Sequence, residues 1–525
     1  MSTARYTRAA LGALLVTFSL PAWSDEPAPE ASADTLQQIV VTATRIPTPQ
    51  LDLASSLTVV SAADIAARQE RTFAEVLKDI PGLNVVQQGG PGAVTAVFMR
   101  GTNSNHTKVL IDGIDVGDPS NATAAYDFGQ LLTQDIERVE VLRGPQSGLY
   151  GSDAIGGVIN VITKSGSGPM KLSATVEGGT FDSFNQSGGI AGATEAFHYA
   201  ADVAHLHSGA TAVTPLDLLA AGEHRMDDSY DNFTASTKLG FDLSPDADLG
   251  LVARYTNTDL HYTGEDYSTF PAFPAAAQSE SKTDQYYGRA TAHFVNFDGA
   301  LNQTLGVGFM HNQTTTLQPQ LPQTLNTGER VKFDWQGAIR VASHETLLLG
   351  AEDARDSISE PLSASSKIAS GYAELQSQLG ERWFSAMNVR YDHHDRFGSK
   401  VTYRFAPAWV NADSGTKLKA SVGSGFKAPT LSELFQDFPP FFFSNPNLRP
   451  ETSVGYDLGV EQGFAGNALR IGVTYFYNRI RDLITTDVTG STWANVGRAT
   501  TEGVESFVAY QPLRQLTVRL DYTYT

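Results

Sequence analysis

The sequence of 525 residues predicts an all-β transmembrane barrel preceded by a smaller α+β domain. Three observations lead to this fold class: an export signal at the N-terminus, a short mixed region with helix caps and strands, and a long region of alternating polar and apolar residues. The absence of cysteine excludes disulfide scaffolds and thiolate metal sites. A formal net charge of −20 argues against nucleic-acid binding as the main activity.

The N-terminus has the features of a secretory signal peptide, residues 1–24. Arg5 and Arg8 precede an apolar run from Ala9 to Leu20, and the small residues after it predict cleavage behind Ser24. The run is too short to span a bilayer, which takes about 18 apolar residues or more. An exported chain can still enter a membrane as a closed barrel, because barrel strands alternate in polarity and have no long apolar run.

Residues 25–49 are expected to form a flexible tail, because their acidic, Pro and Ala residues cannot bury a core. The tail contains one β-rich stretch at about residues 38–44, which begins Gln38-Ile39-Val40-Val41-Thr42-Ala43. It fits either an edge strand of the next domain or an extended peptide that adds as a strand to a partner's sheet. The residues alone favour the edge strand.

Residues 50–168 have the pattern of a compact α+β domain. Ser61 with Asp64, and Thr72 with Glu75, are capping boxes, each of which predicts the start of a short helix. Strands are predicted at 94–99, 108–111, 136–142 and 158–163.

Residues 169–525 consist of segments in which polar and apolar residues alternate, as in Met170 to Glu177 and Val331 to Arg340. Each such strand has one apolar and one polar face. A soluble sandwich would bury the apolar face, whereas an outer-membrane barrel turns it toward lipid and keeps the polar face inside. The many strands and aromatic segment ends such as Tyr475 to Tyr477 favour the barrel.

Several motifs, in this order along the chain, resemble those of the TonB-dependent outer-membrane transporters. Within that family they are most similar to the motifs of transporters for cobalamin (vitamin B12). Residues 38–43 resemble the TonB box of that family. The further motifs, which cover most of the chain, are Val97-Phe98-Met99-Arg100-Gly101-Thr102-Asn103, Val109-Leu110-Ile111-Asp112-Gly113, Val139-Glu140-Val141-Leu142-Arg143-Gly144-Pro145, Tyr150 to Asn160, Gly425-Phe426-Lys427-Ala428-Pro429, Asn445 to Glu451 and Thr501 to Glu505.

The resemblance implies a plug domain inside a nominally 22-stranded barrel in the outer membrane of a Gram-negative bacterium. Such a barrel needs about 440 residues, so we expect this chain to be C-terminally truncated. The implied function is active import of cobalamin or a related corrinoid, driven by TonB with ExbB and ExbD. A ferric-siderophore or other metal-chelate receptor is the first alternative, and a passive porin or adhesin the second. No enzyme constellation is recognisable, and no cofactor is expected.

The resemblance also implies site residues. Two plug arginines at Arg-Gly corners, Arg100 and Arg143, are expected to pair with two barrel glutamates, Glu451 and Glu505. These glutamates occupy the polar positions of their alternating strands and should therefore face the lumen. The corrinoid is expected to contact Val94, Ala96, Asn103, Asn121 and Ala122. Structural calcium is expected at Asp227, Asp228 and Asp266, acidic residues between strands where oxygen ligands can gather; a solvated acidic loop is the alternative.

Overall fold

The computed structural model describes residues 39–525, apart from 220–221, 223, 267–272, 440–441 and 514–515. The predicted signal peptide, the acidic tail and Gln38 therefore lie outside the described residues. No helix among the described residues is long and apolar enough to cross a bilayer.

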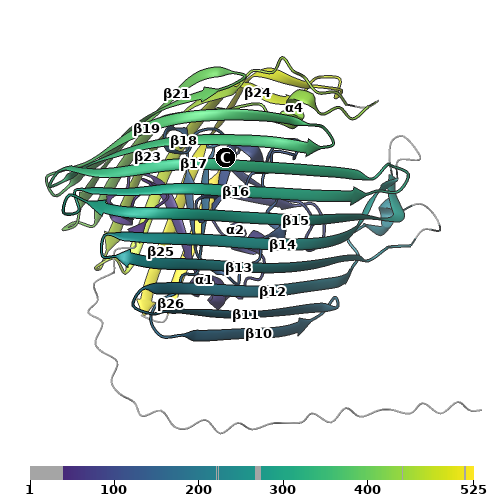
Figure 1. Cartoon of the computed structure of the whole chain (residues 1–525), viewed down its shortest axis with the longest axis horizontal. Helices are drawn as coiled ribbons and strands as arrows, with labels where there is room; N and C mark the ends of the chain where they lie inside the picture. Colours follow the sequence, from purple (N-terminus) through teal and green to yellow (C-terminus); the bar gives the residue numbers. More distant parts are fainter. Residues whose placement is uncertain (1–38, 220–221, 223, 267–272, 440–441, 514–515) are drawn as a thin grey trace, which may run out of the picture. The chain divides into compact units, whose positions relative to one another are not determined.

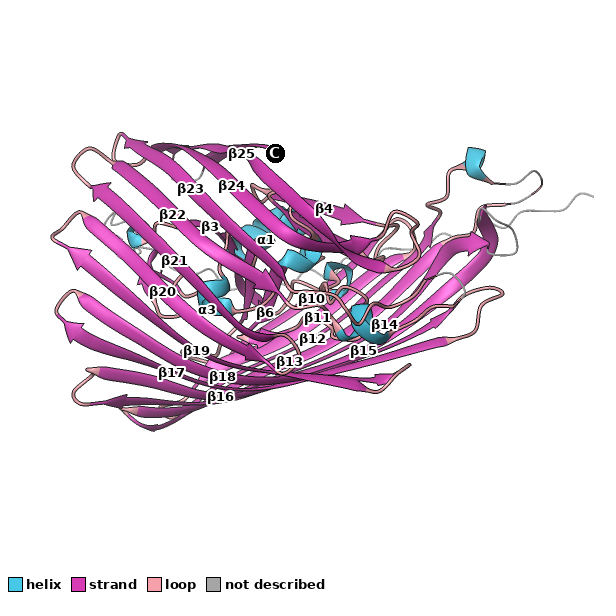
Figure 2. Ribbon diagram, turned by 90° about the horizontal axis from the view of Figure 1, so that it is seen from above, coloured by secondary structure: helices cyan, strands magenta, loops and turns pink. Residues whose placement is uncertain are grey.

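One large antiparallel sheet of 17 strands forms a curved wall (Figure 1, Figure 2). Each strand pairs with the next in chain order, which is the up-and-down connection of a barrel. Within the described residues the two end strands pair on one side only, and the strand number is 17 where the resemblance implies about 22. The strands are β10 (Lys171–Gly179), β11 (Ser183–Ala193), β12 (Phe197–Thr211), β13 (Asp228–Ser244), β14 (Ala247–Asp266), β15 (Phe273–Asn296), β16 (Leu301–Leu317), β17 (Thr324–Ala342), β18 (Glu345–Glu360), β19 (Ala364–Leu379), β20 (Trp383–His394), β21 (Gly398–Asn411), β22 (Thr416–Lys427), β23 (Glu451–Phe464), β24 (Leu469–Thr486), β25 (Trp493–Leu513) and β26 (Leu516–Tyr524).

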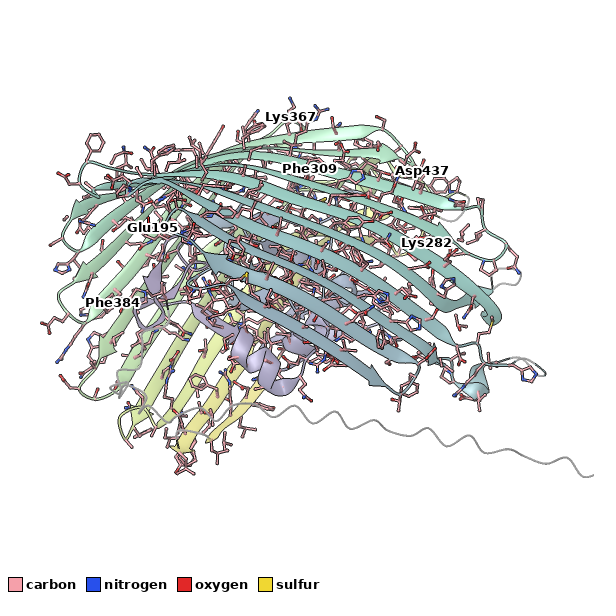
Figure 3. All side chains as sticks on the ribbon, turned by 60° about the horizontal axis from the view of Figure 1, so that its bottom comes forward. Glu195, Lys282, Phe309, Lys367, Phe384 and Asp437 are labelled. Carbon is pink, nitrogen blue, oxygen red and sulfur yellow. The ribbon has the colours of Figure 1, made fainter. Side chains whose placement is uncertain are left out.

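The wall carries side chains on both faces (Figure 3). The inner face is polar and the outer face is apolar. On β14, Arg254 and Thr256 are buried against the inside, whereas Leu249 and Leu251 are 39% and 43% exposed on the outside. A soluble sandwich would bury the leucines instead. The polar-in, apolar-out pattern therefore confirms the predicted membrane barrel and excludes the sandwich.

The plug domain lies within the curve of the wall (Figure 2). Its five-stranded sheet has the order β3-β8-β9-β6-β7, in which β6 and β9 are parallel. Both predicted capping boxes are present. The plug elements are β1 (Ile39–Val40), β2 (Thr48–Pro49), η1 (Gln50–Asp52), β3 (Ser56–Ser61), α1 (Ala62–Arg68), α2 (Phe73–Lys78), β4 (Leu83–Gln87), β5 (Thr95–Met99), η2 (Ser104–His106), β6 (Thr107–Ile111), β7 (Ile114–Asp115), η3 (Phe128–Gln130), β8 (Ile136–Arg143), α3 (Ser147–Tyr150) and β9 (Gly157–Thr163).

The connections between barrel strands differ in length at the two ends of the wall. Short turns such as 244–247 join strands at one end, and long connections such as 427–451 join them at the other. Outer-membrane barrels have short periplasmic turns and longer extracellular loops, so the second end is extracellular. Two short helices lie in these loops, η4 (Leu216–Leu218) and α4 (Leu431–Phe435).

Candidate functional site

The β-rich stretch of the N-terminal tail is docked into the plug. Ile39 pairs with Pro49 and Val40 with Thr48 in a two-stranded sheet, so residues 39–49 are folded and the expectation of a flexible tail was wrong for them. Val40 is fully buried, in a cluster that includes Leu142. The described part of the predicted TonB box is therefore folded against the plug, while Gln38 lies outside the described residues.

A buried carboxylate on β8, Glu140, holds this docked segment. Its Oε2 accepts hydrogen bonds from the backbone N–H of Val41 (3.0 Å) and of Thr42 (2.8 Å), and from the Thr42 hydroxyl (2.6 Å). The Tyr150 hydroxyl donates to the Thr42 carbonyl at 2.7 Å, and the Asn160 amide to the Thr42 hydroxyl at 3.0 Å. These backbone groups are the ones that strand addition to a partner would use.

Arg45 ties the end of the docked segment to the barrel wall. Its Nη1 lies 2.7 Å from Glu352 Oε1 on β18 and donates to the Tyr372 hydroxyl at 2.7 Å. The guanidinium also lies over the Tyr150 and Tyr372 rings, at 4.6 and 4.7 Å from their centroids. Burial lowers the pKa of Arg45, but the neighbouring Glu352 more than offsets this, so the pKa is raised well above its ordinary value.

Glu505 on β25 receives both predicted plug arginines. Arg100 bonds it at two points, Nε to Oε1 at 2.7 Å and Nη2 to Oε2 at 2.8 Å, and Arg143 Nε lies 3.3 Å from Oε2. Arg100 also donates to Asp457 on β23 at 2.7 Å. All four side chains are buried, so the plug and barrel share a group of charges that water does not screen.

Glu451 is not the second glutamate of this group, which corrects the expectation from the sequence. Its Oε2 lies 2.6 Å from Nε2 of His106, and both side chains are fully buried. Asp457, six positions further along the same strand and in the same inward phase, stands where a second glutamate was expected. The polar phase of β23 was readable from the sequence, but it did not indicate which of its carboxylates meets arginine.

Two of the expected substrate residues, Val94 and Asn103, flank β5 on the extracellular side of the plug. Asn103 follows β5 and is exposed, close to His106, which contacts Glu451 at the extracellular start of β23. Val94 precedes β5 and is 51% exposed. Gly92, two residues earlier, lies so close to the Tyr230 ring near the extracellular end of β13 that a Cβ would clash with it.

The remaining expected substrate residues differ in exposure. Asn121 is exposed, whereas Ala96 and Ala122 are half-buried. The Ala122 carbonyl accepts a hydrogen bond from the Thr430 hydroxyl at 3.0 Å, which links the plug loop to the extracellular connection before α4.

The acidic residues expected to hold calcium are not gathered into one group by the described side chains. Asp228 is buried at the start of β13, where its Oδ1 accepts from the Thr263 backbone N–H at 2.8 Å, while Asp227 is exposed. Asp266 ends β14, and its side chain lies outside the described atoms. Calcium at these positions stays a prediction.

A different set of carboxylate and imidazole groups is close enough to share an ion, among the residues the structure describes. Asp259, His261 and Glu280 have ligand atoms within 4.8 Å of one another. Lys282 contacts Glu280, and its Nζ lies 3.4 Å from Asp259 Oδ2. A side-chain cation therefore already neutralises part of this group.

Asp127 is a plug carboxylate with a perturbed pKa. Its Oδ1 accepts backbone hydrogen bonds from Thr95 (2.8 Å) and Gly129 (3.0 Å) at the start of η3. Burial raises its pKa to about 6, and the two backbone bonds offset only part of that effect.

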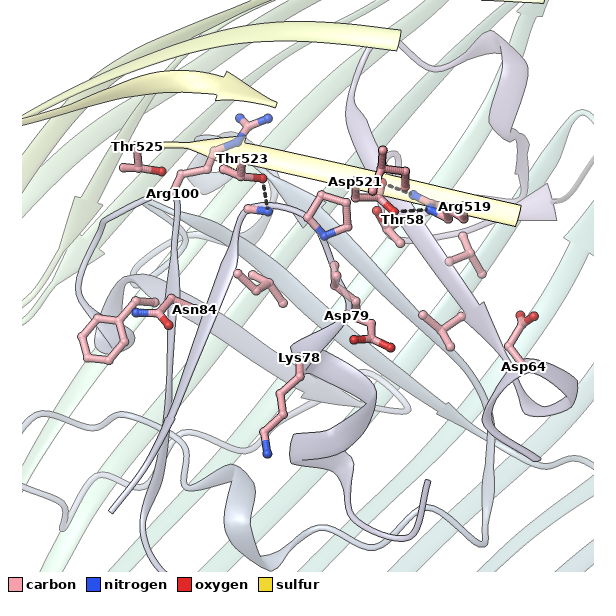
Figure 4. Close-up of a pocket in the computed structure, with 18 of the residues that line it drawn as sticks. Thr58, Asp64, Lys78, Asp79, Asn84, Arg100, Arg519, Asp521, Thr523 and Thr525 are labelled. Carbon is pink, nitrogen blue, oxygen red and sulfur yellow. Dashed lines mark hydrogen bonds and ion pairs between the residues drawn. The ribbon is translucent and has the colours of Figure 1, made fainter. Parts of the chain in front are cut away.

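A pocket of about 1060 Å³ lies between the plug and the end strand β26 (Figure 4). Thr58, Asn84 and Arg100 line its plug side, and Arg519 and Asp521 line its barrel side. Because one wall of the pocket is β26, which within the described residues pairs on one side only, we assign the pocket no ligand.

Comparison with known proteins assigns both parts of the chain. Residues 49–158 match the model described as "TonB-dependent Receptor Plug Domain", and residues 173–525 match "TonB dependent receptor-like, beta-barrel". The chain belongs to the TonB-dependent receptor family. Members of this family lie in the outer membrane of Gram-negative bacteria, and they are receptors and transporters rather than enzymes. Their transport of small molecules depends on TonB, so the porin and adhesin alternatives are set aside.

Individual relatives of this TonB-dependent receptor fall into two groups. The "Vitamin B12 transporter BtuB" of Photobacterium profundum is 30% identical over an alignment of 446 residues, which covers 82% of this chain and 68% of that protein. A mutant ferric enterobactin receptor of Pseudomonas aeruginosa, solved with enterobactin, has a TM-score of 0.74 at 19% identity, over 89% of this chain and 80% of that one. The siderophore receptor PirA of Pseudomonas aeruginosa has a TM-score of 0.70 at 21% identity, over 89% and 84%. The two structures show the fold alone.

Proposed function

We propose that this TonB-dependent receptor imports cobalamin or a related corrinoid across the outer membrane. The observation that carries the proposal is the 30% identity to a vitamin B12 transporter over 446 residues. The exposure of Val94, Asn103 and Asn121 supports it, because these expected contact residues are open to a solute.

The energy for import would come from TonB, coupled to ExbB and ExbD. TonB would bind the stretch at about residues 38–44 by strand addition. Since the backbone N–H groups of Val41 and Thr42 are bound to Glu140, they cannot be donated to a partner strand at the same time. Docking and strand addition therefore compete, and the segment must leave Glu140 before TonB can engage it.

Release of the segment would also break the contact of Arg45 with Glu352 on the barrel wall. The contacts of Arg100 and Arg143 with Glu505 lie elsewhere on the wall, on β25. The plug would thus have a releasable attachment near the N-terminal segment and a firmer one through the buried arginines. Outer-membrane lipid would surround the exposed apolar face of the wall.

The substrate is tested by titrating the purified protein with cyanocobalamin, haemin and a set of ferric siderophores. We expect a dissociation constant below the micromolar range for the corrinoid only. Asn103→Ala should weaken it about fivefold, the effect of one lost hydrogen bond, whereas Glu502→Gln, at an exposed position of β25, should not. Tight binding of a ferric siderophore with no corrinoid binding would refute the proposal.

A further inference from the structure

His106 is a histidine buried at the boundary between plug and barrel, and both of its ring nitrogens are engaged. It ends the short η2 helix, and its side chain is fully buried. Nε2 lies 2.6 Å from Glu451 Oε2 on the barrel, and Nδ1 lies 3.2 Å from the backbone nitrogen of Asn103 on the plug. The ring thus joins the barrel to the residue expected to contact substrate.

The partners fix which nitrogen carries the proton. A backbone N–H can only donate a hydrogen bond, so Nδ1 must be the acceptor and cannot carry a proton. The neutral ring therefore carries its proton on Nε2 and donates it to the Glu451 carboxylate. This tautomer satisfies both polar contacts of a side chain that water does not reach.

The barrel side of this contact is held by several further groups. Glu451 Oε1 accepts a hydrogen bond from the backbone N–H of Ile484 on β24 at 3.2 Å. The other charged groups that face Glu451 are Lys427 on β22 and Glu433 on α4, which lie 3.6 Å from each other. Asp153 of the plug acts electrostatically on Lys427. Glu451 is thus fixed from two strands, and the His106 ring has little freedom to move away from it.

The plug side is fixed by backbone contacts. The His106 N–H donates to the Asn103 carbonyl at 3.0 Å, and the His106 carbonyl accepts from the Gly156 N–H at 2.8 Å. The Asn103 side chain itself is exposed. Its orientation therefore depends on this turn, which Nδ1 of His106 closes.

We propose that His106 is a positioning residue that holds Asn103 in place for substrate, because Nδ1 accepts the hydrogen bond of the Asn103 backbone N–H. Without an acceptor at this point, the Asn103 N–H would lose its bond. The barrel side of the ring is held by Glu451, so the exposed Asn103 turn is the part free to move. The substrate contact of Asn103 rests on the proposed function, whereas the hold of Nδ1 on the turn does not.

The hold is tested with a nitroxide on Asn103→Cys, since the chain has no other cysteine and the substitution keeps the backbone N–H. Two variants separate the ring nitrogens: His106→Asn keeps an acceptor near Nδ1, whereas His106→Gln keeps a donor near Nε2 and loses the acceptor. Label mobility is compared among these proteins under one set of conditions.

We expect the label to be immobile on the otherwise unchanged protein and on His106→Asn, and mobile on His106→Gln. His311→Asn, which removes a ring bonded to Glu329 on the strand next to its own, is the matched control and should leave the label immobile. Equal mobility in all variants, or a mobile label in His106→Asn, would overturn the proposal.

Cyanocobalamin titration of the same His106 variants, with Asn103 unchanged, separates this inference from the proposed function. We expect affinity to fall about fivefold in His106→Gln and to be retained in His106→Asn. Absence of corrinoid binding in every protein, including the one with His106, would refute the proposed function and leave the label experiment to decide on His106. Equal corrinoid affinity in His106→Gln and His106→Asn would refute the role of His106.

Discussion

Glu505→Gln should loosen the plug without unfolding the barrel. Glu505 is buried and bonds Arg100 at two points, with Arg143 3.3 Å away. Removing one partner of a buried charge group costs on the order of 3–5 kcal/mol. Arg100 keeps its 2.7 Å bond to Asp457, so we expect the lower end, about 3 kcal/mol. Since 1.4 kcal/mol is a tenfold change in an equilibrium constant, the open plug should become roughly 100-fold more populated.

Thiol labelling measures this opening, because the natural chain has no cysteine. Ala74→Cys places one thiol on α2, at a position that is 3% exposed. In the Glu505→Gln background we expect labelling to be about 100-fold faster at low urea, while the β-sheet circular dichroism of the wall stays unchanged. The first change reports on the plug and the second on the wall.

Glu502→Gln is the matched control, since the same substitution falls three residues away on β25 at an exposed position. Glu502 accepts a hydrogen bond from the Tyr475 hydroxyl of the neighbouring barrel strand. In the Glu502→Gln variant, the thiol at position 74 should be labelled at the same rate as in the parent protein. Equal rates in Glu505→Gln and Glu502→Gln would show that the arginine contacts do not hold the plug.

Three further perturbations have defined outcomes. Val40→Pro, which removes a backbone donor from the predicted TonB box, should abolish uptake and leave equilibrium ligand binding intact; uptake that survives would mean the segment is only an edge strand. Glu352→Gln removes the carboxylate that holds Arg45, so labelling of a cysteine at the buried Ala43 should accelerate about 100-fold; an unchanged rate would show that this contact does not retain the segment. Asp127→Asn should stabilise the plug by on the order of 2 kcal/mol at pH 7. The pKa of Asp127 is raised in the folded protein, so the parent protein loses stability as the pH rises from about 4 to about 7, whereas the variant does not. The free energies of unfolding of the two proteins, measured in urea, should therefore converge at pH 4, and a difference that is the same at both pH values would contradict this.

The architecture was predictable because strand periodicity and helix caps are local signals. Alternation along segments such as 331–340 follows from the pleat of a strand, and Ser61 with Asp64 marks a helix start whatever the tertiary contacts. The face toward lipid could not be read from periodicity alone, because a sandwich and a barrel share it. The docked position of residues 39–44 was not predictable either, since Glu140, which holds Thr42, lies 98 positions away in the sequence.

The candidate site was predictable where a motif fixes the backbone, and less so where partners are chosen in three dimensions. Arg100 lies at an Arg-Gly corner, which indicated that it ends a plug strand. Which carboxylate it meets depends on the register of β23 and β25 against the plug, so Asp457 was missed and Glu451 was assigned to arginine. The partner of Glu451, His106, carries no local signal, because a histidine after a turn is equally compatible with an exposed position.

The most direct test of the account is uptake of labelled cyanocobalamin by cells that have this protein and no other outer-membrane receptor for corrinoids. Accumulation and surface binding are measured with and without a protonophore. The account predicts accumulation that stops when the proton gradient is dissipated, with surface binding unchanged. Accumulation that continues without the gradient, or cells that bind no corrinoid at all, would contradict it.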